Sequence, residues 1–126
     1  MLKNESNVII TDNTGAKKGQ IFRILKGSNA KTATVGDRVM IAIKEALPTS
    51  AIKKGTISQA LIVRIKKEIH RKDGTYVRFG DNAVILMSKD AKGEVKPLGK
   101  RIFGPVAREL RQMGHKAITN MAEEVV

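Results

Sequence analysis

The sequence predicts a mainly β fold, a small closed β-barrel of about five strands. Two observations predict it: short apolar segments recur between turn residues, and helical periodicity is absent until the C-terminal quarter. A sandwich of two sheets would show the same pattern. We prefer the barrel because closure leaves no strand edge exposed to aggregation.

The first two predicted strands are separated by a turn. The apolar run from Val8 to Thr11 indicates the first strand. Asp12-Asn13-Thr14-Gly15 indicates a turn, since Asp and Asn side chains bond their own backbone and Gly15 accepts a left-handed conformation. The second strand runs from Gln20 to Lys26 and ends at Gly27-Ser28-Asn29. Lys31 to Thr34 is small and polar, so we expect a loop.

A third strand is predicted over Arg38–Leu47, after a turn at Val35-Gly36-Asp37. Alternate residues are apolar, as in a strand with one buried face; they are Val39, Ile41, Ile43 and Leu47. Pro48 ends the strand because proline cannot donate to a sheet. Thr49 to Gly55 is then a connection with a cationic tip at Lys53-Lys54.

A long antiparallel hairpin is predicted over Thr56–Ser88. Its first limb alternates, which predicts a buried face and a solvent-facing face; Leu61, Val63, Ile65 and Ile69 form the first, and Arg64, Lys66, Glu68, His70 and Lys72 the second. Asp73-Gly74 predicts a two-residue turn. The second limb ends in AVILM, which is apolar on both parities and indicates a strand buried on both faces.

The hairpin carries an excess of positive charge. Between Arg64 and Arg78 there are six Lys or Arg residues against Glu68 and Asp73. Charges on an edge strand can serve only to solvate it. We favour a phosphate-contacting surface, because clustered cations of one sign are typical of nucleic-acid binding.

The C-terminal quarter changes character after a polar loop predicted over Lys89–Pro97. Pro105 suits the first turn of a helix, whose apolar stripe is Val106, Leu110 and Met113 and whose C-cap is Gly114. A second short helix is expected over His115–Ala122, and Glu123-Glu124 as an exposed tail. We expect a single domain, with the barrel at about 1–97 and the helical segment at about 98–126.

Composition favours a polyanionic partner. The 126 residues carry 24 Lys and Arg against 12 Asp and Glu, a net charge of +12. Nucleic acid is the commonest partner of such a chain. A membrane surface would require a basic amphipathic helix or a lipidation motif, and the sequence has neither.

Enzymatic chemistry is not indicated. Without cysteine the chain has no disulfide, thiolate metal site or cysteine nucleophile. His70 and His115 lie in different elements with no third ligand at metal-site spacing. Gly93 to Lys100 departs from a phosphate-binding P-loop in its spacing and in Arg101, where Ser or Thr would hold magnesium. We expect no enzyme activity, no metal and no cofactor.

The basic residues gather at turns and on the hairpin, where backbone amides can also donate to phosphates. The candidate RNA-binding residues are Lys17, Lys18, Lys31, Lys44, Lys53, Lys54, Arg64, Lys66, Lys67, Arg71, Lys72 and Arg78. Aromatic residues are only 3% of the chain, and we expect Phe22 and Phe79 in the core. Single-strand binders stack bases on aromatic side chains. We therefore expect contacts to the backbone and shape of folded RNA.

Five stretches carry a resemblance to a known family. They are DNTGAKK from Asp12, VGDRVMIAIKEALP from Val35, KKG from Lys53, the hairpin sequence from Ala60 to Leu86, and GKRIFGPVARELR from Gly99. Together they cover nearly the whole chain. In order and spacing the chain resembles the universal family of large-subunit ribosomal protein fourteen.

The resemblance implies a five-stranded barrel with a projecting β-ribbon and short C-terminal helices. It implies binding to large-subunit rRNA, contact with neighbouring ribosomal proteins, and a place at the subunit interface that touches small-subunit rRNA and forms intersubunit bridges. It also implies a docking site for a ribosome-silencing factor. The matching surface is Lys100, Arg101, Arg108, Arg111 and Lys116.

The resemblance places the chain on ribosomes of the bacterial cytoplasm, the mitochondrial matrix or the plastid stroma. The rival interpretation is a free RNA-binding module or translation factor, which would need exposed aromatic residues on one sheet face. A nucleotide-processing enzyme would need a metal site or an acid–base pair.

Overall fold

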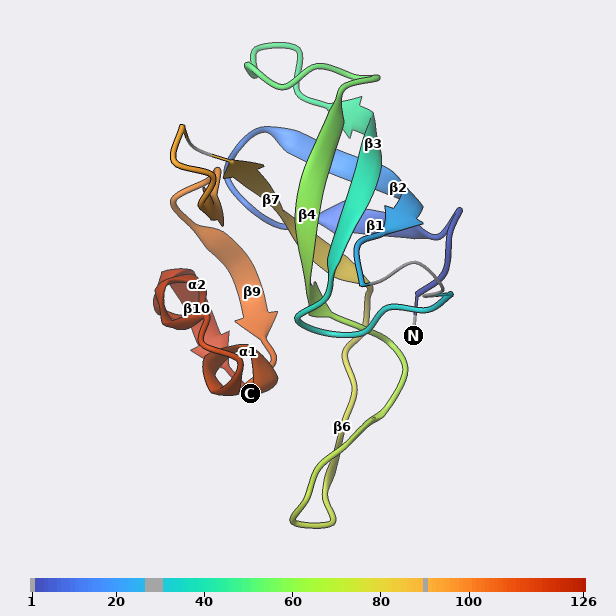
Figure 1. The fold of residues 1–126 in the computed structure, drawn as a ribbon, viewed down its shortest axis with the longest axis vertical. Coiled ribbons are helices and arrows are strands. Elements are labelled where there is room, and N and C mark those ends of the chain that lie inside the picture. The colour runs from blue at the N-terminus through green and yellow to red at the C-terminus, as the bar shows by residue number, and fades with distance from the viewer. Residues whose placement is uncertain (1, 27–30, 90) are drawn as a thin grey trace.

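The computed structural model describes residues 2–26, 31–89 and 91–126. Five strands close into a barrel in the order β1-β2-β3-β4-β7, and β1 pairs with β7 in parallel to complete the ring, which confirms the predicted fold (Figure 1). All other neighbouring pairs in the ring are antiparallel. The strands are β1 (Asn7–Ile10), β2 (Ala16–Ile24), β3 (Arg38–Ala46), β4 (Ile57–Arg64) and β7 (Ala83–Lys89).

The alternation predicted for β3 is confirmed, because Val39, Ile41 and Ile43 are fully buried. Leu47 lies just beyond the strand and is 44% exposed, so its predicted place on the buried face is wrong. β2 begins at Ala16, earlier than predicted. The predicted turn Gly27-Ser28-Asn29 lies outside the described residues.

β4 and β7 are buried on both faces along most of their length. For β7 this was predicted. For β4 the predicted alternation is wrong, because the C-terminal part of the chain covers the outer face: the Ala107 N–H donates to the Val63 carbonyl at 3.3 Å, and Leu110 joins the same core. Arg64, placed on the solvent-facing side by parity, is therefore buried.

The hairpin between β4 and β7 projects from one end of the barrel as a ribbon (Figure 1). Its paired strands are β5 (Ile69–His70) and β6 (Tyr76–Val77). The Arg71 N–H donates to the Thr75 carbonyl and the Gly74 N–H to the Arg71 carbonyl. The loop therefore has three residues, not the predicted two, and Gly74 adopts φ +89°, as such loops require.

The sheet gains a sixth strand, β8 (Val95–Pro97), which pairs with the end of β7. The predicted loop over Lys89–Pro97 is therefore wrong at both ends, because Lys89 belongs to β7. β7 pairs with β1 near its start and with β8 near its end, so it belongs to the closed barrel and also carries the additional strand β8.

The C-terminal unit, residues 102–126, consists of β9 (Ile102–Val106), α1 (Glu109–Gln112), α2 (Lys116–Met121) and β10 (Ala122–Val125). Pro105 and Val106 lie in β9, so the predicted helix start is wrong. The second helix is confirmed, and Gly114 follows α1 with φ +92°. Glu123 and Glu124 are exposed as predicted, but they do not form a tail, because β10 pairs in parallel with β9.

Candidate RNA-binding surface

Ten of the twelve candidate RNA-binding cations are exposed, and two are not. The exposed ones can reach a partner without unfolding any part of the barrel. They are Lys17, Lys18, Lys31, Lys44, Lys53, Lys54, Lys66, Lys67, Lys72 and Arg78. The two exceptions, Arg64 and Arg71, have internal acidic partners.

Neighbouring strands bring Lys18 and Lys44 together on the barrel wall. Both line a shallow hollow of about 310 Å³ whose other walls include Ile9 and Gly19. The Lys18 Nζ lies 3.5 Å from Glu45 Oε2, and both side chains are largely exposed. An exposed pair of this kind is weak, so Lys18 can exchange Glu45 for a phosphate.

Six of the remaining exposed cations lie at the two ends of the barrel, whereas Lys17 belongs to β2 and Lys31 precedes β3. Lys53 and Lys54 belong to the β3–β4 connection, at the end opposite the ribbon (Figure 1). The Lys53 Nζ donates to the Pro48 carbonyl at 3.0 Å, which orders this connection. Lys66, Lys67, Lys72 and Arg78 belong to the ribbon. The candidate cations therefore form separate groups.

Arg64 is a structural residue in the interior. Its Nε donates to Asp81 Oδ1 at 2.8 Å and its Nη2 to Asp81 Oδ2 at 3.2 Å. Its Nη1 donates to the carbonyls of Phe103 at 2.9 Å and Pro105 at 3.0 Å. A Cβ on Gly104 would lie 2.6 Å from Nη1, so only glycine admits the guanidinium here. Sequence parity could not reveal this role.

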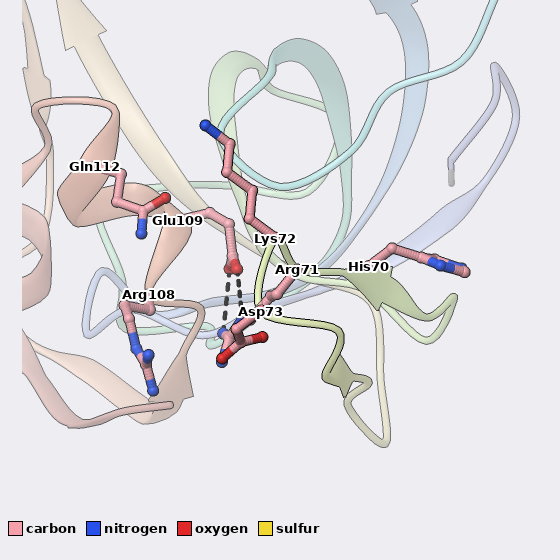
Figure 2. A pocket seen from close by; sticks show the side chains of 7 residues that line it. All are labelled: His70, Arg71, Lys72, Asp73, Arg108, Glu109 and Gln112. Atoms are coloured by element: carbon pink, nitrogen blue, oxygen red, sulfur yellow. Dashed lines mark hydrogen bonds and ion pairs between the residues drawn. The ribbon is translucent and has the colours of Figure 1, made fainter.

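Arg71 also has internal partners. Its Nε donates to Glu109 Oε1 at 2.7 Å and its Nη2 to the Val126 carbonyl at 2.7 Å. The hydrogen bond to Glu109 raises the pKa of Arg71 above its ordinary value. Beside this pair lies a cleft of about 470 Å³ between the ribbon and α1, whose lining includes Lys72 and Arg108 (Figure 2).

The turn after β1 positions the segment that carries Lys100 and Arg101. Asn13 Oδ1 accepts from the backbone N–H of Lys100 at 2.8 Å and of Arg101 at 3.3 Å. Asp12, which is buried, accepts from the Leu86 N–H at 2.8 Å and also binds Thr14. The DNTG motif predicted the local bond to Thr14, but not these distant contacts.

The five residues predicted for the subunit-interface surface are all exposed: Lys100, Arg101, Arg108, Arg111 and Lys116. They come from the segment before β9, from the start of α1 and its last turn, and from the start of α2. The structure thus presents them to solvent on the C-terminal part of the chain.

Three aromatic side chains are exposed, namely Phe22 at 45%, Tyr76 at 63% and Phe103 at 52%. The prediction that Phe22 lies in the core is wrong, because side chains alternate along β2 and the neighbouring Ile21 takes the buried face. Phe79 packs partly against the core, as expected. The exposed three belong to β2, β6 and β9, so they do not share one sheet face.

The two histidines lie apart. His70 makes an edge-to-face contact with Tyr76 on the ribbon, with ring centroids 4.5 Å apart. His115 lies in a hollow near Arg38, and burial followed by the charge of Arg38 lowers its pKa from 6.5. Within the described ranges, no three His, Asp or Glu side chains gather as a metal site would require.

In the part of the chain that the structure describes, no helix is long and apolar enough to cross a bilayer.

Comparison with known proteins agrees with the surface chemistry. Residues 1–126 match the family described as "Ribosomal protein L14p/L23e". The chain is also 48% identical over 125 residues to the "Large ribosomal subunit protein uL14" of Petrotoga mobilis, covering 99% of each chain. The family is one of structural ribosomal proteins, so the prediction of a non-enzymatic role is confirmed. The chain belongs to the ribosomal protein L14p/L23e family.

Proposed function

We propose that this chain is a structural constituent of the large ribosomal subunit that binds large-subunit rRNA directly. The observation that carries the proposal is the division of the cations. Those with internal partners, Arg64 and Arg71, stabilise the fold, while ten candidate cations stay exposed on the rigid barrel and on the ribbon. The 48% identical relative is a large-subunit protein.

The mechanism is charge neutralisation combined with shape. The barrel fixes the backbone that carries the cations, so little order is lost when they meet phosphates. Cations at the β3–β4 connection and on the ribbon lie at opposite ends of the barrel (Figure 1). They would therefore hold at least two RNA segments in a fixed relation, together with neighbouring ribosomal proteins.

The salt dependence of binding to an rRNA fragment tests this function. Each phosphate contact should contribute about 0.7 to 0.9 to the slope of log affinity against log salt concentration. We expect Lys66→Gln/Lys67→Gln to reduce the slope by up to about two units. Arg64→Lys keeps the charge at a buried site and should leave the slope unchanged. Equal slopes for the wild-type protein and the double variant would contradict the proposal for this group.

The C-terminal surface is the proposed contact with the small subunit and its rRNA. It consists of Lys100, Arg101, Arg108, Arg111 and Lys116, all exposed, and it would form intersubunit bridges. The same surface is the candidate docking site for a ribosome-silencing factor. We expect Arg101→Glu to impair subunit joining more than incorporation into large subunits. Sucrose gradients with a normal fraction of joined ribosomes in this variant would remove the idea.

The second interpretation is a free RNA-binding factor. Stable association with large subunits distinguishes a ribosomal component from such a factor. A ribosomal component of a bacterial or organellar ribosome should sediment with large subunits through a high-salt wash. A factor should be released by it. The exposed aromatic residues do not favour the factor, because Phe22, Tyr76 and Phe103 lie on three different elements.

A further inference from the structure

One guanidinium joins the ribbon to the C-terminal unit. Arg71 immediately precedes the three-residue loop of the ribbon, and it contacts Glu109 at the start of α1 and Val126 after β10. The side chains of Arg71 and Glu109 are only 14% and 22% exposed. The pair is therefore better shielded than the exposed Lys18–Glu45 pair, and its contribution should be correspondingly larger.

The ribbon has little else to fix its direction. Only two residue pairs, Ile69↔Val77 and His70↔Tyr76, form its separate two-stranded sheet. A two-stranded hairpin is at best marginally stable when nothing packs against it. The contact of Arg71 with Glu109 lies next to this short ladder, at its loop end.

The same contact lies between two cations of the cleft. Figure 2 shows Lys72 extending from the ribbon and Arg108 from the C-terminal unit, on either side of the bonds that join Arg71 to Glu109. No ion pair links Lys72 or Arg108 to an acid among the residues that the structure describes. Neither side chain is therefore held in a direct ion pair, although the Asp73 carboxylate lines the same cleft and lies close enough to Arg108 for that charge to help lower the Asp73 pKa.

We propose that Arg71 is a positioning residue: through Glu109 it fixes the ribbon against the C-terminal unit, so that Lys72 and Arg108 engage one RNA backbone segment together. The inference rests on the proposed rRNA-binding function and deepens it. Arg71 itself offers the RNA little, because its Nε and Nη2 donate to Glu109 and the Val126 carbonyl and its side chain is only 14% exposed. Because Arg71 holds the ribbon and the C-terminal unit together beforehand, less entropy is lost in ordering these two parts when RNA binds.

The direction in which Glu109→Ala changes RNA affinity distinguishes a positioning role from a purely electrostatic effect. Glu109→Ala removes a negative charge, so electrostatics alone would tighten RNA binding. The positioning role predicts the opposite, an affinity lower by about threefold or more at fixed salt, the size expected for a partly shielded ion pair. Glu68→Ala is the matched control, since it removes an exposed acid of the ribbon and should tighten binding slightly.

Exchange of the two charges provides the rescue. Arg71→Glu alone should weaken binding, and Arg71→Glu/Glu109→Arg, which has the net charge of the wild-type protein, should recover most of the loss. Tighter binding by Glu109→Ala, or no recovery in the exchanged variant, would overturn the inference.

The distance between the ribbon and the C-terminal unit, measured without RNA, tests the positioning role of Arg71 separately from the proposed rRNA binding. The chain has no cysteine, so Tyr76→Cys and Asn120→Cys accept spin labels at exposed sites of β6 and α2. We expect a narrow distance distribution that broadens in Glu109→Ala and narrows again in the exchanged variant. An unchanged distribution in Glu109→Ala overturns the positioning role. A distribution that behaves as expected while no variant binds rRNA overturns only the proposed function.

Discussion

Arg64 and Asp81 form a two-point ion pair, with Nε to Oδ1 at 2.8 Å and Nη2 to Oδ2 at 3.2 Å. Arg64 is only 7% exposed, although a parity argument places it in solvent. Its remaining donors bind the carbonyls of Phe103 and Pro105. A cation of this strongly basic chain is thus used here to join β4 to β9.

Removing this guanidinium should destabilise the fold. In Arg64→Gln the Asp81 carboxylate and two carbonyls lose their donor, and we expect the free energy of unfolding to fall by about 3 kcal/mol. Urea denaturation measures it. Arg78→Gln removes an exposed charge of the ribbon and should change stability by less than about 0.5 kcal/mol. Similar losses in both variants would contradict the internal role of Arg64.

Gly104 should tolerate no side chain. Its φ is +81°, and an added Cβ would approach the Arg64 Nη1 to 2.6 Å. We expect Gly104→Ala to cost about 1 to 3 kcal/mol of unfolding free energy. Gly55→Ala is the control, since Gly55 has a similar φ of +90° and nothing lies within 4 Å of its added Cβ. A thermal melt that shifts equally in both variants would show that the close approach is unimportant.

Asp12 and Asn13 should differ in what they support. Asp12 is 4% exposed and accepts from the buried Leu86 N–H. Asp12→Ala leaves this donor unpaired, so we expect a loss of about 1 to 3 kcal/mol in unfolding free energy. Chemical denaturation followed by circular dichroism measures it, and a loss well below this range would mean that water replaces the carboxylate.

Asn13 acts on an exposed segment, so its loss should affect function more than stability. Water can replace Asn13 at the N–H groups of Lys100 and Arg101, and we expect Asn13→Ala to cost less than about 1 kcal/mol. Because the segment is no longer held, subunit joining should fall. Sucrose gradients test this, and Asn13→Asp, which keeps an acceptor oxygen, should restore joining. Failure of Asp to restore it would point to another role for Asn13.

Stability should depend on pH through His115. Burial and the charge of Arg38 lower its pKa from the ordinary 6.5, and Lys96 lines the same hollow. Below 6.5 the unfolded chain therefore binds more protons than the folded one. The free energy of unfolding should be fully retained above that pH and fall as the pH drops through it. Denaturation between about pH 5 and 8 should show a shallower fall for His115→Gln than for His70→Gln.

Most turns and strands of this chain could be predicted from its sequence. The alternation of β3, the two-sided burial of β7 and the second helix follow from local patterns that the structure confirms. The predicted helix at Pro105 failed because the pattern of Val106 and Leu110 also fits a strand followed by a one-turn helix. The pairing of β9 with β10, a strand further along the chain, makes Val106 part of a strand and not of a helix.

The sequence by itself determined the class of fold, the excess of positive charge and the separation of turns from strands, because these depend on composition and on neighbours a few residues apart. Only the tertiary structure decided which cations are available. Arg64 and Arg71 have their acidic partners 17 and 38 residues away. Whether a guanidinium meets a carboxylate across such separations depends on how strands close and cover one another, and no local pattern records that.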